Sequence, residues 1–365
     1  MARLCEFPVA IRRLFHTFVA TIMLVAAVVV LALSYRAWRQ HQNAVALAIT
    51  TPNGIAEHAF VRINGIDQYI TIRGEDRRNP VLLILAGGPG NTLVSLAQVF
   101  RPWEKYFTIV QWDQRGAGKT FEQNGEAREG PMTIAQMTSD GIKLTEYLCS
   151  HLHKSKIVVL GDSWGTTLGV HMVRARPDLF FAYVGTGQVV GKEEKEAYLY
   201  AAILKKVRAA HDDASLAELE RIGAPPYKSQ QDLLVERDVS QRYDIDSEKN
   251  LRSAMTPVVL FAPDFTLFDI YAMQRYDNFA SNAMYKELIG FDVRKLGPDY
   301  AVPMFVFNGD KDAVTPIIFA KAWFDAIRAP KKEFVILKGG GHSAMLTMPD
   351  VFLHELVTRV RPISN

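Results

Sequence analysis

Residues 157–165 read Ile157-Val158-Val159-Leu160-Gly161-Asp162-Ser163-Trp164-Gly165. An apolar run typical of a buried strand leads directly into the pattern G-x-S-x-G, and a helical pattern continues from Thr166. A serine at the tip of such a sharp strand-to-helix turn leaves no room for side chains two positions before and after it, so glycine stands at both. The turn places the Ser163 hydroxyl at a helix N-terminus, where a developing anion is stabilised. The pattern therefore predicts a nucleophilic serine on a fold of alternating strands and helices.

The remainder of the chain repeats this alternation. The first two expected strands alternate apolar and polar residues, as antiparallel edge strands do, whereas the later ones are continuous apolar runs typical of parallel strands. We expect strands at 59–64, 69–73, 81–85, 107–112, 156–160, 181–185, 304–308 and 334–337, and helices at 134–152, 166–175, 317–327 and 350–360. These elements predict an α/β fold with a mostly parallel, eight-stranded sheet and helices on both faces.

One interval interrupts the alternation of strands and helices. Residues 188–300 are charged and rich in helical patterns, and they contain no clear strand. We therefore expect a helical cap at 188–300, inserted into a core formed by 58–187 and 301–365.

The N-terminal segment carries a separate signal. Residues 14–35 contain no charged side chain, and an apolar stretch of this length can cross a bilayer. It predicts a transmembrane segment or signal anchor, followed by a linker at 36–57. Arginines before the stretch outweigh those after it, which predicts a cytoplasmic N-terminus at 1–13 and a sheet domain on the outer, periplasmic or extracellular side. The alternative is secretion after signal cleavage, because 44–46 and 46–48 are small-x-small sites.

The net charge of +3 originates in this N-terminal segment. Residues 1–40 carry five arginines against one glutamate, and the rest of the chain has 37 basic and 38 acidic residues. This balance predicts no nucleic-acid partner. The two cysteines, Cys5 and Cys149, form no metal-binding or disulfide framework.

A nucleophilic serine needs a base and an acid that orients it. The acid candidates, Asp310 and Asp312, lie in the turn after the strand at 304–308, and Asp312 is favoured because the preceding glycine lets its carboxylate reach back over the sheet. The base candidate is His342, in the turn Gly339-Gly340-Gly341-His342-Ser343. Among nine histidines, only His342 lies in a glycine-rich turn after a strand, where open α/β sheets place their sites.

The oxyanion needs hydrogen-bond donors, which we expect to be backbone N–H groups. One belongs to Trp164, and the other to the loop Ala86-Gly87-Gly88-Pro89-Gly90 after the strand at 81–85, with Gly88 as the donor and Gly87, Pro89 and Gly90 as supporting residues.

A partial phosphate-loop pattern at 116–120 predicts no nucleotide site. The complete pattern G-x-x-x-x-G-K-[ST] requires glycine at position 113, and this chain has Asp113.

Together these motifs resemble the α/β-hydrolase fold and, more narrowly, the proline iminopeptidase family, which removes N-terminal proline from peptides. The similarity covers about 57–187 and 302–361, and its most specific element is Asp113-Gln114-Arg115-Gly116-Ala117-Gly118. It implies a triad of Ser163, Asp312 and His342, with no metal and no cofactor.

Two features depart from the family pattern. Ala86 replaces a histidine, so any side-chain role at that position is lost while a backbone oxyanion site is retained. The cap contains no tryptophan, although the family uses a tryptophan- and glutamate-rich cap segment to bind the substrate amine. The acidic candidates there, which as charged helix residues are expected to be mostly solvated, are Glu193, Glu194, Glu196 and Glu236.

The leading functional hypothesis is a serine hydrolase that forms an acyl-enzyme, specifically a proline iminopeptidase-like aminopeptidase acting on small peptides or amides. The alternative is a carboxylesterase of the same fold. A non-catalytic, membrane-tethered binding protein is the least favoured reading, because no triad residue is missing.

Overall fold

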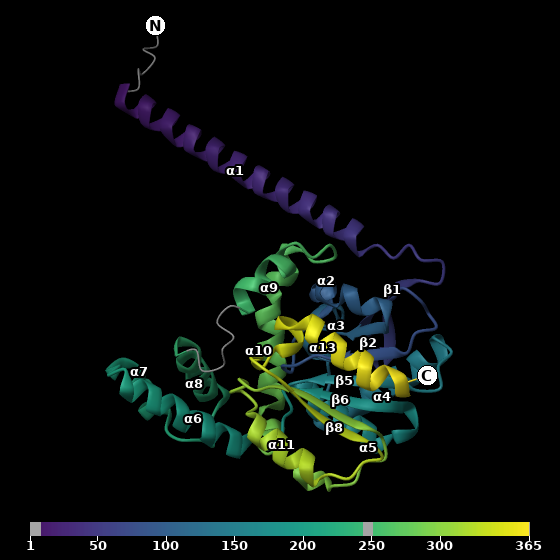
Figure 1. The fold of residues 1–365 in the computed structure, drawn as a ribbon. Coiled ribbons are helices and arrows are strands. Elements are labelled where there is room, and N and C mark those ends of the chain that lie inside the picture. The colour runs from purple at the N-terminus through teal and green to yellow at the C-terminus, as the bar shows by residue number, and fades with distance from the viewer. Residues whose placement is uncertain (1–8, 244–250, 365) are drawn as a thin grey trace.

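The computed structural model describes residues 9–243 and 251–364 (Figure 1). Its eight strands form one sheet in the order β1-β2-β4-β3-β5-β6-β7-β8, in which β2 pairs antiparallel with β1 and β4 and the remaining neighbours are parallel. The strands are β1 (Ile55–Ile63), β2 (Ile66–Gly74), β3 (Val81–Leu85), β4 (Thr108–Trp112), β5 (Ile157–Asp162), β6 (Phe180–Thr186), β7 (Met304–Gly309) and β8 (Lys332–Leu337). The predicted fold class is confirmed.

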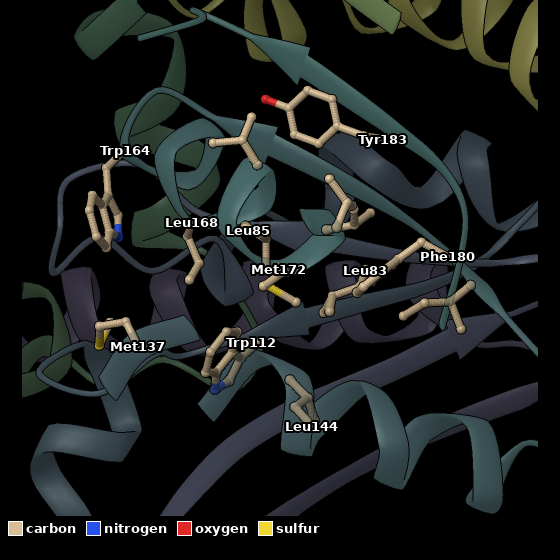
Figure 2. Packing of buried hydrophobic residues seen from close by; sticks show 14 of the residues in the cluster. Leu83, Leu85, Trp112, Met137, Leu144, Trp164, Leu168, Met172, Phe180 and Tyr183 are labelled. Carbon is tan, nitrogen blue, oxygen red and sulfur yellow. The ribbon is translucent and has the colours of Figure 1, made fainter. Parts of the chain in front are cut away.

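Helices cover both faces of this sheet, because successive strand residues point to opposite sides and both sides are apolar. Leu83 and Leu85 face one core, which Figure 2 shows closing against Leu168 and Met172. Leu82 and Ile84 face the other core. The helices of the first face are α4 (Ile134–His151), α5 (Trp164–Ala175) and α11 (Ile317–Ala326), and those of the second are α2 (Ala97–Phe100), α12 (Ala344–Thr347) and α13 (Pro349–Glu355).

Among the described residues, five α-helices lie between β6 and β7: α6 (Lys192–Ala209), α7 (Asp213–Ile222), α8 (Gln230–Arg242), α9 (Leu251–Leu260) and α10 (Leu267–Ile289). Helices α6, α7 and α8 share an apolar cluster of their own, which includes Leu199, Leu219 and Val239. Helix α10 instead contributes Ala280 and Met284 to the main core. One short helix outside this interval, α3 (Gly118–Asn124), packs against α10 and β2.

The N-terminal helix is α1 (Val9–Leu47), and its first part projects away from the rest of the molecule (Figure 1). Residues 12–47 form the one membrane-span candidate in the described ranges, and its most apolar window is not buried. Within the residues expected to form the linker, 36–57, the helix continues to Leu47 and β1 begins at Ile55. Residues 36–47 contain neither glycine nor proline, so nothing in their sequence ends the helix.

Candidate active site

Ser163 forms the sharp turn between β5 and α5. Its backbone has φ +50° and ψ −115°, a strained conformation for a residue with a side chain. A Cβ at Gly161 would lie 2.8 Å from the Thr166 Cα, and a Cβ at Gly165 would overlap the Leu85 carbonyl group. The two glycines of the motif are therefore required by close backbone packing, as the sequence indicated.

The structure brings His342 to this serine. The turn after β8 places the imidazole so that Nε2 lies 2.9 Å from the Ser163 Oγ, which is hydrogen-bonding distance. A Cβ at Gly187, after β6, would lie 2.8 Å from the His342 Cε1, so glycine at 187 leaves space for the ring. This pairing gives the hydroxyl a base within direct reach.

Asp312 occupies the other side of the imidazole. Its Oδ2 lies 3.1 Å from the His342 Nδ1, and its side chain is fully buried. The alternative acid, Asp310, is exposed and accepts a hydrogen bond of 2.7 Å from the backbone N–H of Gly339. Asp310 therefore supports the turn that carries the histidine, whereas Asp312 contacts the histidine itself.

Thr315 is a member of this network that the sequence analysis missed. Its hydroxyl donates to the Asp312 Oδ2 at 2.6 Å and lies 3.2 Å from the His342 Nδ1, while its backbone N–H donates to the Asp312 Oδ1 at 2.7 Å. The only sequence signal is a hydroxyl residue three positions after an aspartate in a turn, a spacing typical of local side-chain-to-backbone bonding. These contacts fix the orientation of the carboxylate.

The loop after β3 lies directly against the serine. A Cβ at Gly87 would lie 3.2 Å from the Ser163 Cβ and 3.3 Å from the Asp162 Oδ2. Gly88 and Gly90 both have positive φ values, +111° and +105°, which only glycine adopts readily. The loop therefore approaches the serine with its main chain, while the donor role of the Gly88 N–H stays a prediction.

Gln114 connects this loop to the serine turn. Its Nε2 donates to the Ala86 carbonyl at 3.2 Å, and its Oε1 accepts from the Trp164 indole Nε1 at 3.0 Å. Both the glutamine and the tryptophan are buried. One amide thus joins the two segments from which the oxyanion donors are expected.

The other residues of the Asp113–Gly118 run stabilise the turn after β4. Arg115 is buried, and its Nε donates to the Asp140 Oδ2 at 2.8 Å. Asp113 accepts from the Lys119 backbone N–H at 2.9 Å, and burial raises the pKa of its carboxyl to about 7. Lys119 Nζ donates to the Asp264 carbonyl at 3.0 Å, so its ammonium group is already bound within the protein.

The segment expected to form a cap contains a buried charge cluster. Contrary to the expectation of solvated faces, Glu196 and Glu236 are buried, and Arg237 lies between them, with Nη2 2.7 Å from Glu196 and Nη1 2.5 Å from Glu236. Lys195 also contacts Glu196 at 3.2 Å. Burial raises the pKa of Glu236 to about 7. The two glutamates can be buried here because Arg237 and Lys195 together supply two positive charges against their two carboxylates.

The other two cap candidates differ from this pair. Glu194 is exposed and pairs with Arg294. The side chain of Glu193 lies outside the described part of the structure.

Comparison with known proteins places these features in a family. Residues 80–349 match the family model described as the alpha/beta hydrolase fold. The chain is 29% identical to the probable aminopeptidase YbaC of Bacillus subtilis, over 86% of this chain and 99% of that protein. It is 24% identical to a probable proline iminopeptidase of Leptolyngbya boryana, over 76% of this chain and 85% of the relative.

A solved structure shares the fold. The proline iminopeptidase-related protein of Thermus thermophilus superimposes with a TM-score of 0.60 at 17% identity, covering 85% of this chain and 99% of that one.

Proposed function

This chain belongs to the α/β-hydrolase family, and we propose that it is a serine hydrolase that works through an acyl-enzyme. The observation that carries the proposal is the continuous hydrogen-bonded series from Ser163 Oγ to His342 Nε2, at 2.9 Å, and from His342 Nδ1 to Asp312 Oδ2, at 3.1 Å. A nucleophile, a base and an orienting acid in this order are the requirements of acyl transfer.

The chemistry follows from these contacts. His342 takes the proton of Ser163 as Oγ attacks the substrate carbonyl carbon, and Asp312 stabilises the imidazolium that forms. The tetrahedral oxyanion accepts hydrogen bonds from the backbone N–H groups of Trp164 and Gly88. His342 then returns the proton to the leaving group, which departs as the acyl-enzyme forms. A water molecule, deprotonated by the same imidazole, attacks the acyl carbon and releases the acid and Ser163.

For the substrate, we propose a small peptide or amide with a free N-terminal amine, consistent with the relatives named as aminopeptidases and proline iminopeptidases. Two buried carboxylates in the cap, Glu196 and Glu236, support this class because they are acceptors for an ammonium group. The apolar cluster of the cap also contacts Ala313, which is adjacent to Asp312. Proline specificity remains part of the proposal.

One observation favours a carboxylesterase as the alternative. Arg237 and Lys195 contact the two cap carboxylates, so the four groups together carry no net charge when all are ionised. A neutral cluster attracts an amine much less strongly than two unpaired carboxylates. An ester without a free amine would not need that attraction.

We further propose that α1 is retained as a signal anchor, with the hydrolase domain on the outer side of the membrane. The uncharged residues 14–35 have the length of a membrane span. The residues just after them bind the cap through Arg36, Gln40 and Asn43, contacts that cleavage near Ala46 would remove.

Labelling with a fluorophosphonate probe tests the central proposal, with Ser163→Ala as the matched control. Folded wild-type protein should label and the variant should not, and a folded wild-type protein that does not label would contradict a serine hydrolase. A panel of aminoacyl arylamides, including prolyl, beside short-chain aryl esters then separates the substrate classes. Activity on the esters alone would replace the aminopeptidase with the esterase. N-terminal sequencing that begins near Ala46 or Ile49 would exclude a retained anchor.

A further inference from the structure

The structure points to a second contact with the membrane besides the anchor helix. We propose that the first turns of α10, with the side chains of Leu267, Phe268 and Tyr271, lie in the headgroup region of the phospholipid bilayer. We call these three residues the α10 patch. The inference rests on the proposed retention of α1, and it adds a lipid-binding surface to the hydrolase domain itself.

The first step is the attachment of α1 to the cap. Arg36 is the first charged residue after the uncharged stretch, so its guanidinium belongs at the membrane–water boundary. Its Nε donates to the Leu260 carbonyl at 3.0 Å, and its Nη2 donates to the Phe265 carbonyl at 2.6 Å. One helical turn later, the Gln40 Nε2 donates to the Phe265 carbonyl at 2.9 Å. These bonds therefore hold the α9–α10 loop beside the point on α1 where the uncharged stretch 14–35 ends.

Aromatic side chains strengthen this junction. The Tyr35 ring contacts the Phe261 ring edge to face, with centroids 5.8 Å apart, and the Arg39 guanidinium lies 5.2 Å from the Phe261 centroid. Tyr35 and Trp38 are nevertheless about half exposed, at 51% and 54%. Tyrosine and tryptophan with arginine are the residues that favour the interface between hydrocarbon and water. The composition of the junction agrees with the position assigned to Arg36.

The α10 patch begins two residues after the Phe265 carbonyl that Arg36 and Gln40 bind. Leu267 is 48% exposed, Phe268 64% and Tyr271 82%. Positions 267, 268 and 271 are related by helical spacings of three and four, so the three side chains share one face of α10. In Figure 1 the loop at the top of α9, which leads into α10, lies near the end of α1 that joins the domain, in agreement with the hydrogen bond from Arg36 to the Phe265 carbonyl. Without a bilayer, these three large apolar side chains would be exposed to water. Their transfer into lipid is therefore favourable.

The start of α10 is also rigid enough to hold such a contact. Thr266 accepts a hydrogen bond from the Asp269 backbone N–H at 3.1 Å, and the Asp269 carboxylate accepts one from the Thr266 backbone N–H at 2.6 Å. This reciprocal cap fixes the first turn of the helix. The patch is therefore part of a preformed surface.

The same helix reaches the proposed catalytic centre. A Cβ at Gly90 would lie 2.7 Å from the Asp277 Cα, and the Ser281 hydroxyl donates to the Pro89 carbonyl at 3.3 Å. At 1.5 Å per residue, Ser281 is about 20 Å along α10 from Leu267. The start of α10 would contact lipid, and the loop beside Ser163 packs farther along the same helix. Helix α10 would therefore fix the distance of the active site from the bilayer.

The test uses the full chain in nanodiscs of phosphatidylcholine and phosphatidylglycerol. Cys5→Ser and Cys149→Ser provide the background, and Tyr271→Cys carries a bimane label. The matched control is Ile336→Cys, on β8, which is similarly exposed at 51%. We expect quenching by aqueous iodide to be at least about threefold weaker at position 271 than at position 336, and quenching by lipids spin-labelled near the headgroup to be stronger at 271.

Equal iodide quenching at the two positions, with no lipid quenching at 271, would overturn the lipid contact. Fluorophosphonate labelling of the same samples separates this outcome from the proposed function. Protein that reacts at Ser163 but exposes position 271 to iodide contradicts the lipid contact alone. Protein that is lipid-bound at 271 but does not react contradicts the hydrolase alone.

Discussion

The Trp164 indole Nε1 donates a hydrogen bond of 3.0 Å to the Gln114 side-chain carbonyl, and the amide nitrogen of the same glutamine donates to the Ala86 carbonyl. Gln114 therefore joins the residue after the proposed nucleophile to the start of the loop that faces it. Because an oxyanion site depends on the relative position of its two donors, we infer that Gln114 is a positioning residue for that site.

Replacing Gln114 by leucine should lower kcat by about 10- to 100-fold and leave KM nearly unchanged, since a misplacement of about 1 Å has effects of this size. Steady-state kinetics on the best substrate of the panel and the rate of fluorophosphonate labelling measure the change. Trp164→Phe, which keeps an aromatic ring but removes the indole N–H donor, should reproduce part of the loss. A Gln114→Leu enzyme with wild-type kcat and a lowered melting temperature would show that the glutamine is only structural.

Thr315→Val should reduce kcat by about tenfold, because it removes the hydroxyl that binds the Asp312 carboxylate while the backbone N–H of residue 315 keeps its own bond. Thr315→Ser restores the hydroxyl and should recover most of the activity. Kinetics of the two variants, compared at equal folded fraction, make the measurement. A loss in Thr315→Ser but not in Thr315→Val would instead assign the effect to packing of the threonine methyl group, which valine keeps and serine lacks.

Much of the fold could be predicted from the sequence, because the first two strands alternate apolar and polar residues, the later ones are mostly continuous apolar runs, and turns bound them all. All eight expected strands overlap the observed ones, and the strand at 81–85 has the same bounds. The proposed triad was accessible for a related reason, since Ser163, Asp312 and His342 each follow a strand in a glycine-containing turn. Parallel strands bring such turns to one edge of the sheet.

The features that the sequence analysis missed depend on contacts between distant segments. Gln114 acts between two loops, and no local pattern reveals which side chains it bonds. Helix α1 continues past Tyr35, and the Arg36 side chain donates to the carbonyls of residues 260 and 265. A hydropathy pattern cannot predict such a contact. The burial of Glu236 likewise depends on Arg237 and Glu196 meeting across two helices.

Gly87→Ala tests how closely the loop after β3 approaches the serine. The new methyl group would lie 3.2 Å from the Ser163 Cβ and 3.3 Å from the Asp162 Oδ2, so the loop or the serine turn must shift by a few tenths of an ångström. We expect kcat/KM to fall by about tenfold or more with a small loss of stability. Gly290→Ala is the control, because its nearest neighbour would be 3.8 Å away. Similar activity in both variants would contradict a close catalytic role for the loop.

Asp113 predicts a pH dependence of stability. Burial raises the pKa of its carboxyl in the folded protein from an ordinary value of 3.8 to about 7. Between these values the folded protein holds a proton that the unfolded chain has lost, so the free energy of unfolding falls as the pH rises from about 4 to 7. Asp113→Asn lacks this titration and its amide can still accept from the Lys119 backbone N–H. The melting temperature of the variant minus that of the wild type should therefore increase by several degrees from pH 5 to pH 8. If the difference in melting temperature between the two proteins did not change with pH, Asp113 would be ionised in the folded protein throughout this range, which would contradict the raised pKa.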